Sequence, residues 1–189
     1  MRKVARVVGT AVVIDRDNID TDQIIPSRYL KKITRTGYAE GLFAEWRKDP
    51  SFPLNDVARR GAVILIAGAN FGCGSSREHA AWALDEWGFR AIVAPSFADI
   101  FRANAVRSGV VPVVLPPEGV RRLMALAADP HREFSVDLAS ETVSTRGLSG
   151  TFAIGVFDRT RLLEGLDDIA ITLRHASAIE RYESASARR

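Results

Sequence analysis

The sequence has only one cysteine, Cys73, among its 189 residues. A lone cysteine cannot form a disulfide within the chain, and it cannot by itself hold a four-cysteine zinc or iron-sulfur site. Any iron-sulfur cluster that the protein uses must therefore be bound by another chain. We expect no metal ligands in this one.

Long apolar runs are also absent. The longest one after the N-terminal region, at 61–72, is far shorter than the roughly 20 residues that cross a membrane. The chain starts basic and then apolar, as a signal peptide does, but Arg6 interrupts the apolar run and acidic residues follow without a small-residue cleavage site. We therefore expect a soluble, cytoplasmic protein that has no membrane partner.

Clusters of basic residues are missing as well, although the formal net charge is +3. The 26 basic residues are dispersed among 23 acidic ones, with no basic run longer than two. No basic patch is interleaved with aromatic residues either. This distribution is typical of a solvated surface rather than of a stripe that follows a phosphate backbone. We do not expect nucleic acid as a partner.

Apolar runs alternate with amphipathic segments through the middle of the chain. The pattern predicts alternating strands and helices at 61–67, 75–87, 90–94, 96–107, 110–115 and 117–128. Such alternation is typical of parallel βαβ units. Other short elements are a predicted helix at 38–48 and predicted strands at 4–8, 11–14, 133–138, 142–145 and 150–156. The sequence therefore predicts an α/β fold with β-rich ends.

The length and composition suit one well-packed domain, because 47% of the residues are hydrophobic. No internal repeat and no low-complexity linker divides the sequence. We expect a single domain at 1–183, followed by a frayed, disordered tail at 184–189.

One stretch between a predicted strand and a predicted helix concentrates flexible and reactive residues: GANFGCGSSREHA, at 68–80. Its glycines permit positive φ angles and close approach of a ligand to the backbone. Ser75 lies where a helix N-cap is expected, with Glu78 completing an S-x-x-E capping box. The N–H groups of the helix start and the planar fork of Arg77 favour an anion. A small carboxylate fits best, because the patterns of the common phosphate loops are absent.

Each of these residues also has a purely structural interpretation. Ser75 can be a cap alone, Cys73 can simply fill the loop, and His79, one turn deeper on the helix, is better explained as a packed side chain. Arg77 is the hardest to explain structurally, because an arginine in a first helical turn opposes the helix dipole.

Longer motifs carry a resemblance to a known family. GCGSSREHAAWAL, at 72–84, resembles the serine-rich loop of the swivelling domain in the aconitase superfamily. NIDTDQIIPSRYLKKITRTG, at 18–37, is similar to the upstream loop of isopropylmalate isomerase (3-isopropylmalate dehydratase) small subunits, and 94–113 and 162–183 resemble later parts of the bacterial form. One departure is Ala81, where many relatives carry proline. Another is Cys73, whose position is filled by other residues in relatives, which favours the loop-filling interpretation of the thiol.

This resemblance implies a fold and a reaction. The fold is a swivelling β/β/α domain with a mixed, largely parallel central sheet or barrel flanked by helices. The reaction is the interconversion of 2- and 3-isopropylmalate, a dicarboxylate substrate, by dehydration and rehydration in leucine biosynthesis. The partner is a large subunit that carries a [4Fe-4S] cluster, and this chain alone is inactive.

The resemblance also implies residue roles. Ser75 would be the catalytic base, and Asp22 matches an active-site aspartate of the superfamily. The substrate-binding residues would be Ser76, Arg77, Gly74 and Thr21. A structural interpretation remains for Asp22, because Asp20, Thr21 and Asp22 can all be turn caps.

Two alternatives stay open. One is a related hydratase or isomerase subunit acting on homoaconitate, citraconate or a dimethylated malate, and we expect the loop at 29–36 to border the variable group of the substrate. The other is a non-catalytic module that binds a metabolite or RNA, although a regulator has no need of paired serines ahead of an arginine.

Overall fold

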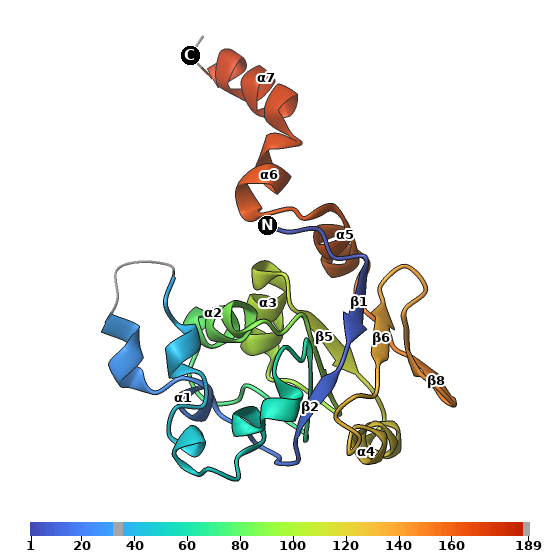
Figure 1. Cartoon of the computed structure of the whole chain (residues 1–189). Helices are drawn as coiled ribbons and strands as arrows, with labels where there is room; N and C mark the ends of the chain where they lie inside the picture. Colours follow the sequence, from blue (N-terminus) through green and yellow to red (C-terminus); the bar gives the residue numbers. More distant parts are fainter. Residues whose placement is uncertain (32–35, 187–189) are drawn as a thin grey trace.

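The computed structural model describes residues 1–31 and 36–186, and the strands of these residues form two four-stranded sheets (Figure 1). The parallel sheet has the order β2 (Ala11–Ile14), β3 (Ile64–Ala67), β4 (Ala91–Ala94) and β5 (Val111–Val114). The antiparallel sheet has the order β1 (Arg6–Gly9), β6 (Phe134–Asp137), β7 (Thr142–Thr145) and β8 (Leu148–Thr151). The predicted α/β fold with a largely parallel central sheet is confirmed, and the antiparallel strands form a sheet of their own.

The two sheets differ in burial, as their sequences require. All four residues of β3 and of β4 are buried, which suits a parallel sheet that is covered on both faces. In β6 the buried residues Phe134 and Val136 alternate with half-buried polar ones, as expected where one face packs and the other meets water.

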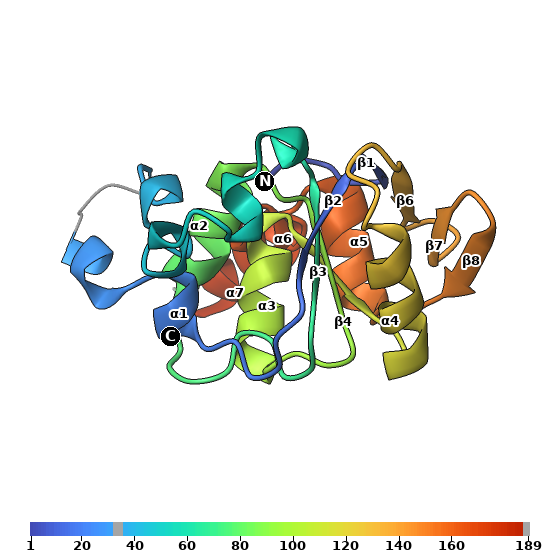
Figure 2. The same cartoon turned by 60° about the horizontal axis from the view of Figure 1, so that its bottom comes forward.

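Helices follow three of the parallel strands, as predicted: α2 (Glu78–Trp87) after β3, α3 (Asp99–Ser108) after β4 and α4 (Pro117–Leu126) after β5. α2 and α3 pack against each other, whereas α4 contacts β3 and β4. Figure 2 shows α2 and α3 on one side of the parallel strands and α4 with β6 to β8 on the other. The parallel sheet is thus the middle layer.

Each face of the parallel sheet has its own hydrophobic cluster. Leu65 and Ala67 of β3 belong to the cluster under α2 and α3, together with Phe71 and Phe101. Ile64 and Ile66 belong to the other cluster, which the side chains of α4 and of the antiparallel sheet complete. This division follows from the two-residue period of a strand.

The long connection between β2 and β3 is made of short turns. It contains the helix α1 (Thr21–Ile24) and 3₁₀ turns at Ser27–Lys31, Ala39–Gly41, Trp46–Lys48, Pro53–Asn55 and Val57–Arg59. The predicted helix at 38–48 is therefore wrong. Phe43 adopts a φ of 46° and donates its N–H to the Ile24 carbonyl at 2.7 Å, which takes the backbone out of a helical path.

The end of the chain is helical, with α5 (Val156–Glu164), α6 (Asp168–Leu173) and α7 (Ala176–Ser186). The strand predicted at 150–156 is displaced as well as shorter, because β8 covers Leu148–Thr151 and Val156 already begins α5. Figure 1 shows α6 and α7 extending away from the two sheets. Residues 184–186 of the predicted tail continue α7, and 187–189 lie outside the described residues. The single-domain boundary stays a prediction. In the described residues no helix is long and apolar enough to span a membrane.

Candidate active site

Two loops meet where adjacent parallel strands end, and we call them together the seam: residues 16–22, which follow β2, and residues 68–77, which follow β3. Parallel neighbours share a carboxyl edge, so these loops start side by side. Backbone hydrogen bonds then join them along their length: Gly68 N–H to Arg16 O at 3.1 Å, Asn18 N–H to Ala69 O at 2.8 Å, Gly72 N–H to Ile19 O at 2.7 Å and Thr21 N–H to Cys73 O at 2.9 Å.

Two glycines of the seam permit this close approach. A Cβ on Gly72 would overlap the Phe101 ring, and the φ of Gly72 is 77°. A Cβ on Gly68 would overlap Asp17 Oδ1 and the Arg16 carbonyl. Only glycine fits at these positions, because every other residue carries a Cβ.

The predicted capping role of Ser75 is wrong. α2 begins at Glu78, and its N-cap is Arg77, which has extended φ and ψ of −118° and 108° and makes no side-chain capping bond. The capping box in the seam belongs to Asp20 and Gln23 of α1: the Asp20 carboxylate accepts the Gln23 N–H at 2.7 Å, and Gln23 Oε1 accepts the Asp20 N–H at 3.0 Å. Ser75 and Asp22 are therefore not the caps of these helices.

Thr21 holds Ser75 in place through its hydroxyl group. The Thr21 side chain is buried, and its hydroxyl donates to the Ser75 carbonyl at 3.0 Å. The two hydroxyl oxygens, Thr21 Oγ1 and Ser75 Oγ, lie 3.4 Å apart. Gly74, Ser75 and Ser76 themselves are exposed, so the Ser75 hydroxyl is held in place by a buried neighbour while it remains open to a reactant.

Arg77 and Asp22 form an ion pair across the seam, between Nη1 and Oδ1. The Arg77 side chain is only 21% exposed, whereas Asp22 is 57% exposed. A guanidinium held this way keeps a fixed orientation and still has further N–H donors on its fork. The arrangement can bind a carboxylate beside the Ser75 hydroxyl.

The chain is similar to known proteins of one family. The family model for the aconitase C-terminal domain matches residues 1–118. The 3-isopropylmalate dehydratase small subunit of Rubrobacter xylanophilus is 55% identical over 184 residues, which cover 97% of this chain and 94% of that protein. The chain belongs to the 3-isopropylmalate dehydratase small-subunit family. The small subunit of Parafrankia sp. is likewise 55% identical, over 93% of this chain and 91% of that protein.

A solved structure supports the same family. A crystal structure of 3-isopropylmalate dehydratase from Methanocaldococcus jannaschii superposes with a TM-score of 0.67 at 27% identity, covering 94% of this chain and 99% of that chain. The words "small subunit" in the names of the relatives imply a large-subunit partner. The aconitase C-terminal domain model includes the whole seam and the parallel sheet, since it ends at residue 118.

The family's motif and its upstream loop come together in the seam. The structure places all of the residues predicted for the site on this edge: Thr21, Asp22, Gly74, Ser75, Ser76 and Arg77. Cys73 is half-buried and contributes its carbonyl to the contact with Thr21. His79 packs edge-on against Tyr38 and Trp82, with ring centroids 5.1 and 4.7 Å away, which agrees with its structural interpretation.

Polar residues that the sequence analysis did not single out also hold the seam. Asp17 Oδ1 accepts the Ala69 N–H at 2.6 Å. Asn70 donates its side-chain amide to Asn18 Oδ1 at 2.8 Å, and both asparagines adopt positive φ angles, of 57° and 56°. The available signal was the residue type, because asparagine and aspartate favour such turns. No local sequence pattern indicates that the two loops pair with each other.

The loop predicted at 29–36 to border the substrate lies partly outside the described residues, which omit 32–35. Its C-terminal flank is bound to α2 by a single carboxylate. Glu86 Oε2 accepts the backbone N–H groups of Gly37, Tyr38 and Ala39 at 3.0, 2.6 and 3.0 Å. The helix α2, which follows the serine-rich loop, therefore also holds residues 37–39 at the end of this second loop.

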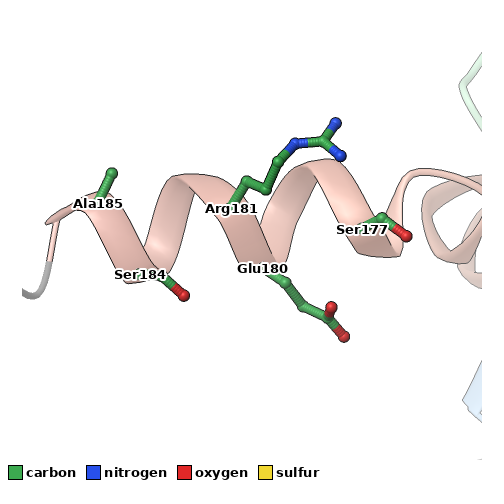
Figure 3. Close-up of a pocket in the computed structure, with 5 residues that line it drawn as sticks. All are labelled: Ser177, Glu180, Arg181, Ser184 and Ala185. Carbon is green, nitrogen blue, oxygen red and sulfur yellow. The ribbon is translucent and has the colours of Figure 1, made fainter.

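The described residues contain no group of three or more His, Cys, Asp or Glu side chains that could hold a metal ion. A hollow of about 500 Å³ lies along α7, but the residues that line it all come from that one helix (Figure 3): Ser177, Glu180, Arg181, Ser184 and Ala185. In Figure 3, Glu180 and Arg181 point to different sides of the helix. One helix cannot enclose a ligand, so this hollow is not a candidate active site.

Proposed function

We propose that this chain is the small subunit of a 3-isopropylmalate dehydratase, which interconverts 2- and 3-isopropylmalate in leucine biosynthesis. The observation that carries the proposal is the seam: a supported serine hydroxyl, a fixed arginine fork and an aspartate meet on one exposed edge. The identity of about half of the sequence with such small subunits, over nearly the whole length, supports the same function.

The reaction removes water to give an alkene and adds it back with the opposite orientation. The proton that leaves is on a carbon next to a carboxylate, so it is weakly acidic, and negative charge builds up as it leaves. Ser75 Oγ is proposed to take this proton as an alkoxide and to return one on rehydration. Because Ser75 is not the helix cap, its hydroxyl is available for this role.

An alkoxide needs positive charge and N–H donors near it. Arg77 supplies a guanidinium that is mostly buried, where electrostatic interactions are stronger than in water. Its planar fork suits two parallel hydrogen bonds to a substrate carboxylate. The exposed Ser76 hydroxyl and the backbone of Gly74 are the neighbouring groups proposed to bind the same carboxylate, with Thr21 holding the loop.

Asp22 orients Arg77 in this chain through their ion pair. Its exposure leaves the carboxylate accessible to the partner subunit as well, where it is proposed to orient a side chain of that subunit. We keep Asp22 as a site residue for these reasons.

The large subunit is proposed to complete the site from the open side of the seam. A [4Fe-4S] cluster is proposed to lie there, since this chain has one cysteine and no metal-binding group among its described residues. When bound, the cluster supplies the Lewis acidity that helps the hydroxyl group of the substrate to depart. We place this metabolic enzyme in the cytoplasm.

The test is an assay of this chain with its own large subunit carrying an intact cluster. We expect isomerase activity from the complex and none from this chain alone. Among isopropylmalate, homoaconitate, citraconate and dimethylmalate, isopropylmalate should give the highest kcat/KM. Activity of the isolated chain without any iron-sulfur protein contradicts the proposed division of the site, and preference for another acid assigns the chain to a related isomerase.

A further inference from the structure

The last two helices present apolar side chains to solvent, and we call this part of the chain the arm: α6 and α7, residues 168–186. Ile169 and Leu173 are 71% and 64% exposed and lie four residues apart on α6. Ile179 and Tyr182 lie three residues apart on α7 and are 38% and 75% exposed. These spacings place each pair on one face of its helix.

An apolar groove lies at the base of the arm. It has a volume of about 470 Å³ between α5 and α6, and its apolar lining comes from Val156, Phe157, Leu166 and Ile171. Val156 and Phe157 are themselves 82% and 62% exposed. The groove and the exposed faces of the arm thus belong to one region of the surface, which contains most of the large exposed apolar side chains among the described residues.

The base of the arm is tied to the body of the molecule. Arg161 of α5 is buried, and its Nη2 bonds Asp168 Oδ1, on the first residue of α6, at 2.6 Å. Arg174, just after α6, pairs with Glu164 at the end of α5. The arm therefore leaves the body in a set direction, which Figure 1 shows as an extension beyond the sheets.

The arm lacks the packing that normally stabilises such helices. α7 is 11 residues long and none of its described side chains is buried. A helix shorter than about 12 to 15 residues is marginal in water without tertiary contacts. Apolar surface of this kind marks a binding site for another macromolecule.

Its position in the sequence indicates which macromolecule covers it. The aconitase C-terminal domain model ends at residue 118, well before the arm. The likeness to a separate small subunit extends over 184 of the 189 residues and so includes most of the arm. A subunit that is a separate chain must be held by surface contacts, so a segment outside the shared domain but inside the small-subunit family fits that need.

We propose that the arm and the groove at its base are the docking surface for the large subunit. The proposal rests on the proposed function, because it assumes that this subunit is the partner. The occupant is an apolar surface of the large subunit, since the arm exposes the large apolar side chains of Ile169, Leu173, Ile179 and Tyr182 among its polar ones.

The experiment measures the dissociation constant between the purified full-length chain and its large subunit, by titration of a labelled subunit. One variant carries Leu173→Gln and Ile169→Gln, and a second carries Tyr182→Gln and Ile179→Gln. Glutamine keeps helix propensity and removes the apolar surface. The matched control is Val57→Gln, which changes a side chain that is 66% exposed outside the arm.

We expect each double variant to raise the dissociation constant at least tenfold, while Val57→Gln leaves it within twofold. At saturating large subunit, kcat should be unchanged, because the arm contains no seam residue. Dissociation constants within twofold of wild type for both double variants overturn the proposal. A wild-type chain that forms a dimer, lost in the double variants while binding to the large subunit is retained, assigns the arm to self-association and also overturns it.

The proposed function can fail separately. A wild-type complex that forms with the expected sensitivity to the arm variants, but has no activity on isopropylmalate, leaves the docking surface in place and removes the proposed substrate. A wild-type chain that does not bind the large subunit removes both proposals.

Discussion

The seam and the arm both lie at the surface, but they are stabilised in opposite ways. In the seam, backbone hydrogen bonds join two loops that are distant in sequence, and a buried threonine holds the serine loop. Glycines occupy positions where a Cβ would overlap neighbouring atoms. In the arm, the described side chains of α7 are all unburied, and the base is held by ion pairs. The groups proposed for catalysis are thus ordered within the chain, whereas the arm is proposed to gain its packing from a partner.

The largest expected effect is on turnover. Ser75→Ala should lower kcat of the assembled complex by about 10²- to 10⁴-fold, the contribution typical of a general base. Folding should survive, because Ser75 does not cap α2. Cys73→Ala, two residues away, should keep most of the activity. The measurement is steady-state kinetics with a wild-type large subunit, and an active serine variant beside an inactive cysteine variant contradicts the assignment.

The rigidity of the seam predicts a large loss of stability from one added methyl group. Gly72→Ala should destabilise the chain by about 2 to 4 kcal/mol, since it combines overpacking against Phe101 with an unfavourable positive φ. Gly147→Ala is the matched control, because Gly147 has a φ of 83° and nothing within 4 Å of the added Cβ. It should cost only about 1 kcal/mol. Urea denaturation of both variants gives the comparison, and equal losses would show that the ring contact does not matter.

A smaller effect is expected from Arg77→Lys, which keeps the charge and removes the planar fork. We expect kcat to fall and KM to rise, with kcat/KM lower by about 10- to 100-fold, the worth of one charge-assisted hydrogen bond. Arg121→Lys, on an arginine of α4 that is 69% exposed, is the control and should be silent. Near wild-type constants for the Arg77 variant would remove Arg77 from the active site.

The smallest effect should come from the arm in the isolated chain. Leu173→Gln alone should change the free energy of unfolding by no more than about 0.5 kcal/mol, because the side chain is exposed. Thermal and urea unfolding of the chain without its partner provide the measurement. A loss of 2 kcal/mol or more would mean that the arm packs on its own body, and the contrast with the seam would then be wrong.

Much of the fold was predictable from local patterns. The strands and helices from β3 to α4 were expected close to their observed positions, because buried apolar runs and amphipathic periods are local signals. The helix predicted at 38–48 failed for a tertiary reason, since the bond from Phe43 to Ile24 competes with the helix. The capping box at Ser75 also failed. The one formed by Asp20 and Gln23 has an equally local spacing and was overlooked.

The site itself was only partly predictable. The residues of the serine-rich loop are adjacent in sequence and pointed to an anion by their chemistry. Asp22 entered through the family resemblance alone, because a contact with Arg77, 55 residues away, leaves no mark on local patterns. The direction of the Arg77 side chain and the support from Thr21 likewise depend on packing that no short window contains.

The long separation of the seam's two loops has a consequence for how the site comes into being. Thr21 and Ser75 lie 54 residues apart, and Asp17 and Ala69 lie 52 apart, so the chain must close a large loop before any of these contacts exists. Contacts of this kind form slowly in folding because the entropy of closure must be lost first. A peptide that contains only the serine-rich loop would keep the sequence of the motif but would not adopt its folded conformation. The site is therefore formed in the same folding step that pairs β2 with β3. Cleavage of the connection between these strands, followed by separation of the two parts, would abolish both the strand pairing and the site.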